Sequence, residues 1–412
     1  MITGKRLVEP SFFYKGKGMK EGWPFYVAYS IWLVVALLNT TPLVEYLGHR
    51  NMFYAVVPIL LFIGELKEIR SYSKLEWISL FALIALNIQT YVFGGNNLAI
   101  LSMLLFCSRK MKFSDIALIS VLVDTVILVV IPSMTAFGLI EDVINIRPNG
   151  TVRSSLGFSY VTYASYVLKN IVMLAVLFVP FERVLGKTIY LLLFIANTVI
   201  LMETDARNGC GLIYIALLIS PVLQKYEKTR NRPLNENSLL GRMIVNDYLI
   251  LFALFLVAVV SFTLFPKSKL LQWMDSLCSL RLTYTSYAFG QFGIPLFGGT
   301  GVDLIAEGLT IDSSYFRIVY EHGLIVLLLV VVGLQKIQVR LCEDGNITLL
   351  FVLFLVAVHS VFDAQLISVQ HNTLILLLAS LFPGGQLFGK AATKKGGAPG
   401  DGREDVCIVD DD

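Results

Sequence analysis

Twelve apolar stretches run along this chain, separated by loops that alternate in charge. An apolar helix needs about 20 residues to cross the hydrocarbon core of a bilayer, and several of these stretches are shorter. Their boundaries are therefore approximate, particularly for the short second and fourth spans. The expected spans are Pro24–Asn39, Met52–Gly64, Trp77–Phe93, Leu98–Cys107, Ile116–Phe137, Tyr160–Val179, Thr188–Met202, Cys210–Leu223, Ile244–Leu264, Arg317–Leu334, Ile347–Val361 and His371–Phe382.

The composition excludes an ordinary soluble domain of this length. Hydrophobic residues make up 56% of the 412 residues, charged residues only 15%, and the mean hydropathy is +0.72. A typical soluble domain carries about 25% charged residues. We therefore predict an all-α polytopic membrane protein with about twelve transmembrane helices.

The charges of the loops predict an orientation in the membrane. Every second loop is rich in Lys and Arg, whereas the intervening loops carry few basic residues. Cytoplasmic loops hold the excess of positive charge in membrane proteins. This rule places both termini in the cytoplasm, and the bias is the one expected of an inner-membrane protein. The net charge of +3 gives no reason to expect a nucleic-acid partner, because its distribution follows the loops.

The same pattern divides the chain into five regions. They are 1–22 (a cytoplasmic segment), 23–265 (spans one to nine), 266–316 (a long outer loop with short helices), 317–382 (spans ten to twelve) and 383–412 (a disordered cytoplasmic tail). The outer loop is too long for a simple connector. Apolar residues at helical spacing between Leu270 and Leu277 predict a short helix, lying on the membrane surface or packed against the bundle.

The five cysteines are scattered, with no Cys-x-x-Cys motif and no His/Cys cluster. This spacing indicates neither a metal site nor a disulfide framework. We therefore expect no metal and no cofactor. A single bridge between Cys210 and Cys278, both near the outer face, is the alternative to free thiols.

The outer side of the predicted bundle keeps a small set of arginines. These are Arg50, Arg147, Arg153, Arg207, Arg281 and Arg317. A planar guanidinium donates two parallel hydrogen bonds to phosphate or carboxylate, so arginine suits a site that holds an oxyanion in a fixed orientation. A single arginine at the end of a span can instead extend to the lipid headgroups. The set as a whole favours an anion-binding site on the outer face.

Four segments in this part of the chain resemble motifs of the Wzy-type polysaccharide polymerases. Arg153–Tyr160 reads RSSLGFSY and is similar to their Arg-x-Ser-Leu-Gly-Phe segment, and Thr204–Gly209 (TDARNG) is similar to their Thr-x-Ser-Arg-x-Gly turn. Leu296–Gly301 (LFGGTG) resembles their glycine-rich loop. Ile311–Phe316 (IDSSYF), followed by Gly323–Ile325, resembles their Val-Asp-Asn-Ser-Tyr-Leu stretch and closing Tyr-Gly-Leu-Ile. The order of the motifs and the predicted side of the membrane agree.

One position separates this chain from the related O-antigen ligases. Those enzymes carry a His-[Asn/Ser/Gln]-x9-Gly pattern, and Asp312-Ser313 with Gly323 has the same spacing with Asp in place of His. The departure favours a polymerase over a ligase and leaves the catalytic base open. Ala206 and Ser313 also stand where the polymerases usually have Ser and Asn.

The resemblance implies glycosyl transfer at the outer leaflet. The donor would be an undecaprenyl-pyrophosphate-linked oligosaccharide, and the acceptor a sugar hydroxyl of another lipid-linked repeat unit. The product would be an O-antigen, capsule or exopolysaccharide. Besides the lipid bilayer, a chain-length regulator is the other partner that this family suggests.

The residue types present meet the demands of that reaction. The expected ligands of the pyrophosphate, on which negative charge develops, are Arg153, Arg207 and Arg281. The candidates for the base that takes the proton of the acceptor hydroxyl are Asp312, Glu321 or His322 near the start of the tenth span, and His371 at the start of the twelfth. Asp312 has the resemblance in its favour, whereas an imidazole such as that of His371 titrates near neutral pH.

Two other functions use the same features. A flippase for lipid-linked sugars would also use outward arginines, but it predicts a central polar cavity, broken helices and pseudo-symmetry. The chain has no internal repeat and concentrates its polar groups at one face. A ligase-type transferase would share the fold and the phosphate site and would differ in the acceptor.

Charged residues within spans are costly and need partners. Asp124 and Lys169 lie at similar depth in the fifth and sixth spans. We expect them to form a structural ion pair between these two helices. A proton relay is the alternative.

Overall fold

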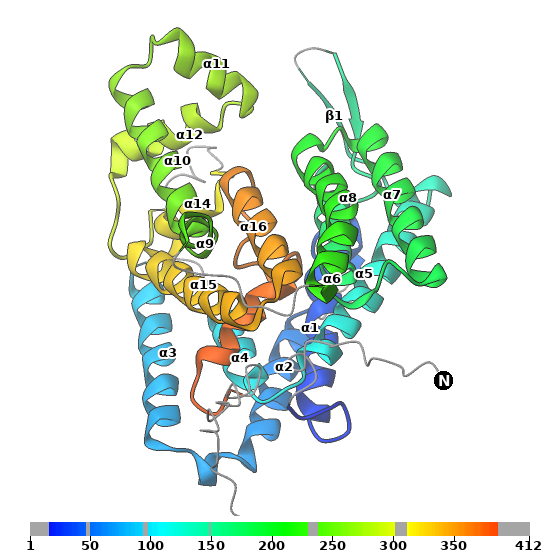
Figure 1. The fold of residues 1–412 in the computed structure, drawn as a ribbon, viewed down its shortest axis with the longest axis vertical. Helices are drawn as coiled ribbons and strands as arrows, with labels where there is room; N and C mark the ends of the chain where they lie inside the picture. The colour runs from blue at the N-terminus through cyan, green and yellow to red at the C-terminus, as the bar shows by residue number, and fades with distance from the viewer. Residues whose placement is uncertain are drawn as a thin grey trace, which may run out of the picture.

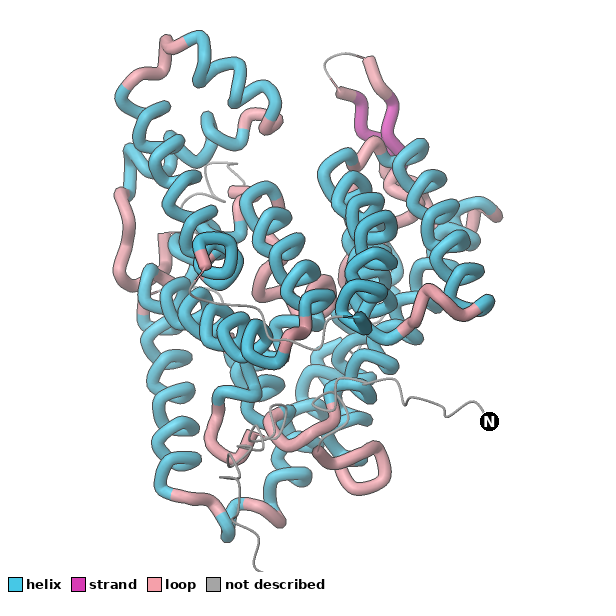
Figure 2. The backbone as a smooth tube through the Cα atoms, viewed as in Figure 1, coloured by secondary structure: helices cyan, strands magenta, loops and turns pink. Residues whose placement is uncertain are grey.

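The computed structural model describes residues 16–46, 50–93, 98–147, 150–229, 238–300 and 311–385. The described chain is almost wholly helical and contains one small two-stranded sheet (Figures 1 and 2). The prediction of a helical fold is therefore confirmed. Six helices in these ranges are long and apolar enough to cross a membrane, which fits a multi-pass membrane protein.

The helices and strands fall into three groups. The long apolar helices are α3 (Lys74–Val92), α5 (Phe113–Ala136), α7 (Val184–Thr204), α8 (Arg207–Thr229), α10 (Asp247–Leu264) and α15 (Leu324–Asp344). Shorter apolar helices are α1 (Trp23–Leu38), α2 (Arg50–Leu66), α4 (Ala99–Ser108), α6 (Tyr163–Phe178) and α16 (Ile347–Phe362). The connecting elements are η1 (Pro42–Tyr46), η2 (Ile69–Ser71), β1 (Ile144–Ile146), β2 (Val152–Ser154), α9 (Leu239–Val245), α11 (Lys269–Leu277), α12 (Arg281–Phe292), α14 (Ser314–His322) and η3 (Thr373–Leu381).

Helix α3 shows why this fold needs an apolar surrounding. It begins at a capping box, in which Ser73 and Glu76 each accept a hydrogen bond from the other's backbone N–H. Only 11% of the residues in its most apolar 18-residue stretch are buried in the protein, and Ile78, Phe81 and Ile88 are exposed. A helix of a soluble protein buries its apolar stripe against the core. The outer surface of α3 therefore fits a lipid environment.

The tenth expected span is broken at Gly323, which separates α14 from α15. Gly323 has a φ of +97°, and a Cβ at this position would lie 2.4 Å from the carbonyl oxygen of Leu296. Only glycine fits this backbone shape in so little space. The chain therefore ends one helix and begins the next inside what was expected to be a single span.

The twelfth expected span is a 3-10 segment, η3, in place of an α-helix. Residues Thr373–Ser380 are buried, and η3 packs against α4, α5 and α15. A 3-10 helix rises about 2 Å per residue, so a segment of this length is too short to cross a hydrocarbon core of about 30 Å. Its high apolar content reflects burial inside the protein.

The elements expected on the outer side lie together at one end of the molecule. The β1–β2 hairpin, α11 and α12 occupy one end of the long axis, and the turn between α2 and α3 occupies the other (Figure 1). The expected short helix at Leu270–Leu277 is present as α11. Most of the expected cytoplasmic tail, from residue 386, and residues 1–15 lie outside the described residues. The number of spans and the sides of the termini stay predictions.

The expected ion pair between Asp124 and Lys169 is wrong. Asp124 Oδ2 accepts a hydrogen bond from Asn170 Nδ2 (2.8 Å), and Lys169 Nζ lies 3.2 Å from His359 Nδ1. Consecutive residues of a helix point about 100° apart, so Lys169 and Asn170 face different neighbours. The partner of Asp124 on α6 is therefore the amide of Asn170, and Lys169 faces α16.

The thiols of Cys210 and Cys278 are free, so the alternative of a bridge between them is not realised.

Candidate functional site

The hairpin formed by β1 and β2 holds the motif that begins at Arg153. Asp142 Oδ1 accepts hydrogen bonds from the hydroxyl (2.9 Å) and the backbone N–H (3.0 Å) of Ser155, and Oδ2 accepts one from the Ser154 hydroxyl (2.6 Å). The N–H of Gly157 donates to Asp142 Oδ1 over 3.3 Å. Gly157 has a φ of +80°, and a Cβ there would lie 1.9 Å from a threonine hydroxyl. The two serines and the glycine of the motif therefore fix the shape of the loop.

Arg153 itself is buried, with an exposed fraction of 9%. Its Nε donates a hydrogen bond of 2.6 Å to the carbonyl oxygen of Thr204 at the end of α7. Burial, and then repulsion from Arg147, lowers the pKa of Arg153. Its guanidinium also interacts electrostatically with the phenols of Tyr160 and Tyr166. Arg153 therefore supplies a desolvated positive charge beside two tyrosines.

Arg207 lies at the surface of the turn that joins α7 to α8. Asp205 has a φ of +47° in this turn, and its carboxylate accepts contacts from Arg207 Nε (2.7 Å) and Arg147 Nε (3.2 Å). Gly209 packs so closely on α6 that a Cβ would lie 3.0 Å from Ser165 Oγ. The side chain of Arg207 is 63% exposed. It is thus a surface cation paired with its neighbour, whereas Arg153 is buried.

Arg281 is positioned by the capped start of α12. Asp275 Oδ1 accepts hydrogen bonds from the backbone N–H groups of Leu282 (2.9 Å) and Thr283 (3.1 Å), and the carboxylate thereby caps the helix. The chain reaches this cap through Leu280, which has a φ of +63°. Arg281 therefore leaves a rigid helix end that faces the C-terminus of α16.

The guanidinium of Arg281 is fixed by two carbonyl groups and faces two carboxylates. Nε donates to the carbonyl oxygen of Phe362 (2.5 Å) and Nη1 to that of Cys278 (2.9 Å). Nη2 lies 3.6 Å from Asp312 Oδ2 and 3.7 Å from Asp363 Oδ1. These two contacts are longer than a hydrogen bond. The structure therefore brings Arg281 and Asp312, both expected site residues, together with a second aspartate.

Asp363 follows α16 and was not expected from the sequence. Its side chain is 7% exposed, and Oδ1 accepts a hydrogen bond of 2.6 Å from the Tyr166 hydroxyl. Oδ2 lies 3.3 Å from His359 Nε2. The ammonium group of Lys169 is a donor, so its 3.2 Å contact with His359 Nδ1 assigns the imidazole proton to Nε2, facing Asp363. Lysine, histidine and aspartate thus form a continuous polar line.

The two carboxylates beside Arg281 hold their protons more strongly than exposed ones. Burial raises the pKa of Asp363 to about 6, although Arg281 and the Tyr166 hydroxyl oppose the shift. Desolvation also raises the pKa of Asp312, against Arg281 and Arg317. The side chain of Asp312 is 45% exposed and that of Asp363 is 7% exposed, so Asp312 is the more accessible of the two. A carboxylate with a raised pKa is a stronger base.

Tyr160 links the surroundings of Arg153 and Arg281. Its phenol interacts electrostatically with Arg153 and Arg281, and with Asp312 and Asp363. Half of its side chain is exposed. Charges from the hairpin and from the α12 region therefore both interact with the accessible phenol of Tyr160.

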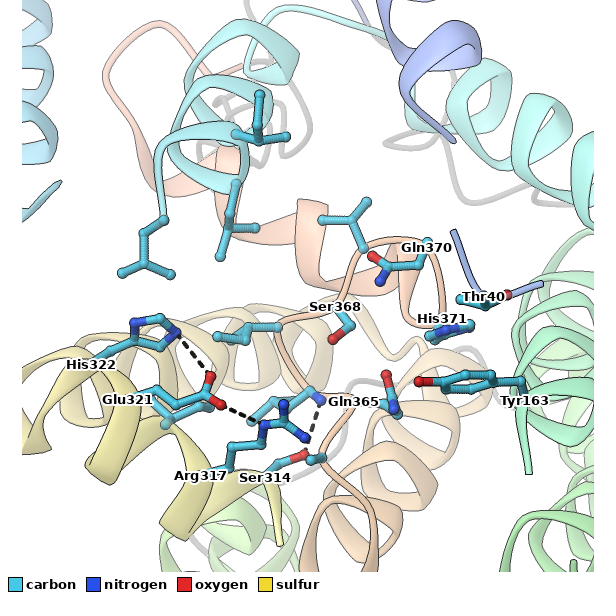
Figure 3. A pocket seen from close by; sticks show the side chains of 18 of the residues that line it. Thr40, Tyr163, Ser314, Arg317, Glu321, His322, Gln365, Ser368, Gln370 and His371 are labelled. Atoms are coloured by element: carbon cyan, nitrogen blue, oxygen red, sulfur yellow. Dashed lines mark hydrogen bonds and ion pairs between the residues drawn. The ribbon is translucent and has the colours of Figure 1, made fainter. Parts of the chain in front are cut away.

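A cavity of about 350 Å³ lies beside α14, with Ser314, Arg317 and Glu321 on its wall (Figure 3). The expected site residues Glu321, His322 and His371 line this cavity. Ser314 joins the two sites: its hydroxyl donates to the carbonyl oxygen of Asp363 (2.5 Å) and accepts from the N–H of a cavity residue, Leu366 (3.0 Å).

The glycine-rich loop shapes this region through its backbone. A Cβ at Gly298 would lie 2.3 Å from the carbonyl oxygen of Glu321, and the N–H of Gly299 donates to the Tyr320 carbonyl (3.0 Å). The loop therefore packs directly on the end of α14. Gly301, at the end of the motif, lies outside the described residues.

Comparison with known proteins adds no further constraint. The chain matches no protein-family profile, no curated protein and no solved structure. The chemistry of the site therefore rests on its own residues.

Proposed function

We propose that this protein polymerises lipid-linked oligosaccharide repeat units into a surface polysaccharide. The donor is an oligosaccharide on undecaprenyl pyrophosphate, and the acceptor is a sugar hydroxyl of another repeat unit. The reaction takes place at the outer leaflet of a bacterial plasma membrane. A chain-length regulator is a proposed partner.

One observation carries the proposal: a fixed arginine faces two carboxylates of raised pKa. Arg281 uses Nε and Nη1 on backbone carbonyl groups, and its Nη2 stands free of any contact shorter than 3.6 Å with Asp312 and Asp363. A preorganised cation stabilises the charge that develops on a pyrophosphate leaving group, and no metal ion is required for this step. The adjacent carboxylates supply a base within the same site.

The proposed step is a displacement at the anomeric carbon of the donor. Asp363 takes the proton of the acceptor hydroxyl while the hydroxyl oxygen forms the new glycosidic bond. The bond between the anomeric carbon and the pyrophosphate oxygen breaks, and the lipid pyrophosphate leaves with the electron pair. Arg281 and the buried Arg153 hold this anion, and Arg207 extends the positive surface at the edge. Asp312 either shares the role of base or holds Arg281 in place.

The test uses purified protein in detergent with radiolabelled lipid-linked repeat unit as the only substrate. We expect products of two or more repeat units, separated by gel electrophoresis. A flippase moves lipids between leaflets and lengthens nothing in detergent. A ligase lengthens nothing unless its separate acceptor is added. Either result, obtained with folded protein, contradicts the proposal.

Variants of the site sharpen this test. Asp363→Asn keeps the size of the side chain and removes the base, and Arg281→Gln removes the cation. Loss of a general base lowers a rate about 10²–10⁴-fold. Arg183→Gln is the matched control, because Arg183 is exposed at the start of α7 and makes no side-chain cap hydrogen bond. If Asp363→Asn elongates as fast as the control, the assignment of the base fails.

A further inference from the structure

We infer that the cavity beside α14 binds one uncharged sugar unit. It is lined by residues of α1, α4, α6 and α14 and of the connection at 364–371 (Figure 3). That this sugar belongs to the acceptor repeat unit rests on the proposed function. The cavity itself is a binding site distinct from the cluster around Arg281.

The charges of the cavity cancel within it. Arg317 Nε donates to Glu321 Oε1 over 2.8 Å, and Glu321 Oε2 lies 3.8 Å from His322 Nε2 (Figure 3). An anion placed here would compete with Glu321 for the guanidinium and would meet the repulsion of the carboxylate. A neutral ligand avoids both effects and can accept from one partner while it donates to the other.

Several polar side chains of the cavity have unused hydrogen-bonding capacity. Gln365, Ser368 and Gln370 are half-buried, and in the described chain their side chains make no hydrogen bond to protein. His371 is 2% exposed, and its Nδ1 has no hydrogen-bond partner among the described residues. Buried polar groups in native proteins are almost always paired, so this set indicates a polar ligand or water. Amides, a hydroxyl and an imidazole match the mixed donors and acceptors of sugar hydroxyls.

The remaining wall of the cavity is apolar and aromatic. Trp32, Leu98 and Leu101 contribute to it, and Tyr163 stacks on His371 with ring centroids 5.7 Å apart. A pyranose ring has hydroxyl groups around its edge and C–H groups on its faces. A cavity that is polar on one side and apolar on the other therefore fits a sugar ring better than water alone.

The size of the cavity limits the ligand. Ligand-binding cavities span roughly 300–1,000 Å³, and a volume of about 350 Å³ is at the lower end. One sugar residue, or two at most, occupies such a space, and the rest of a repeat unit extends outside. The Ser314 hydroxyl lines the cavity and donates to the backbone carbonyl of Asp363, so the cavity adjoins the segment that carries the proposed base.

The test measures direct binding, independent of catalysis. Saturation-transfer NMR on the protein in lipid nanodiscs, prepared without sugar detergents, uses a panel of methyl glycosides and inorganic pyrophosphate as probes. We expect at least one glycoside to bind. Gln370→Leu and His371→Phe should each weaken that binding about tenfold, the effect of one or two lost hydrogen bonds. His371→Phe keeps the ring against Tyr163, and Gln272→Leu on the exposed face of α11 is the matched control.

The outcomes separate this inference from the proposed function. Absence of glycoside binding, equal binding by Gln370→Leu and the wild type, or displacement of the glycoside by pyrophosphate overturns the cavity inference. Elongation by the wild type does not depend on any of these three results. Conversely, Arg281→Gln should bind the glycoside normally and fail to elongate. Glycoside binding by a wild type that never elongates overturns the function and leaves the cavity assignment in place.

Discussion

Replacement of Asn170 by leucine should destabilise the protein by about 2–6 kcal/mol. Asn170 Nδ2 donates to Asp124 Oδ2 (2.8 Å) and to Thr373 Oγ1 (3.0 Å), and its Oδ1 accepts from the Thr373 N–H (3.0 Å). Three interhelical hydrogen bonds at about 0.6 kcal/mol each set the lower limit of about 2. In the variant the Thr373 hydroxyl can turn to Tyr29. The other two partners stay buried and unpaired, at about 1–3 kcal/mol each, which sets the upper limit.

The free energy of unfolding is measured by titration with dodecyl sulfate in mixed micelles. Asn87→Leu is the matched control, because Asn87 joins α3 to α4 through a single side-chain hydrogen bond to Ser102 (2.9 Å) and is half-buried. We expect the control to lose about 0.6 kcal/mol. If Asn170→Leu loses no more than Asn87→Leu, the network does not hold α5, α6 and η3 together as described.

A double-mutant cycle tests the partners directly. In the Asn170→Leu background, Asp124→Leu should cost little, since the hydrogen bond between them is already absent. Lys169→Met combined with Asp124→Leu should be additive within about 0.5 kcal/mol, because these two residues have separate partners. Strong coupling of Asp124 to Lys169 would restore the ion pair expected from the sequence.

Three further predictions concern charged groups. Elongation should slow as the pH drops below about 6, because the base form of Asp363 is present only above its raised pKa. Initial rates of Asp363→Asn should not show this fall at acid pH. A fall that remains in the variant would mean that another group titrates. Arg109→Met should lower the free energy of unfolding by about 3–5 kcal/mol, because Arg109 is fully buried and holds Glu65 through Nη1 and Nη2 (both 3.0 Å). Thermal unfolding of the variant in detergent at the wild-type temperature would contradict this prediction. Burial raises the pKa of Asp142, but hydrogen bonds from the Ser154 hydroxyl and its neighbours lower the pKa overall. The ionised carboxylate therefore stabilises the fold fully above the ordinary pKa of about 3.9, and this stabilisation is lost as the pH falls from there through the lower pKa of the folded protein. Melting temperatures of the wild type between pH 3 and 7 should show this loss, and Asp142→Asn should flatten it; parallel curves for the two proteins would refute the assignment.

The apolar pattern predicted helices because it repeats along the chain, but it did not show where the chain turns. Gly323 breaks a run that reads as one span, since its φ of +97° and the nearby Leu296 carbonyl are properties of the fold. The apolar run at Thr373–Leu381 likewise reads as a membrane span, although burial within the protein demands the same residue types.

The sequence predicted some residues of the candidate site and missed others. Arg153 and Arg281 stand out as single basic residues on a side that has few, so local composition identified them. Asp363 and His359 lie at the end of an apolar helix with no motif around them. Their partner Tyr166 is 197 positions away from Asp363 along the chain. Only tertiary packing brings these groups to Arg281.

The Asp142 carboxylate shows which residues of the Arg153–Phe158 segment are structural. The serines and the glycine of this segment donate hydrogen bonds to Asp142, whereas Arg153 does not and can contact a ligand. A change of ligand or of reaction at Arg281 would leave this anchor in place, because the loop needs it to keep its shape. The serines and the glycine thus report how the loop folds, and the proposed chemistry depends on the groups around Arg281.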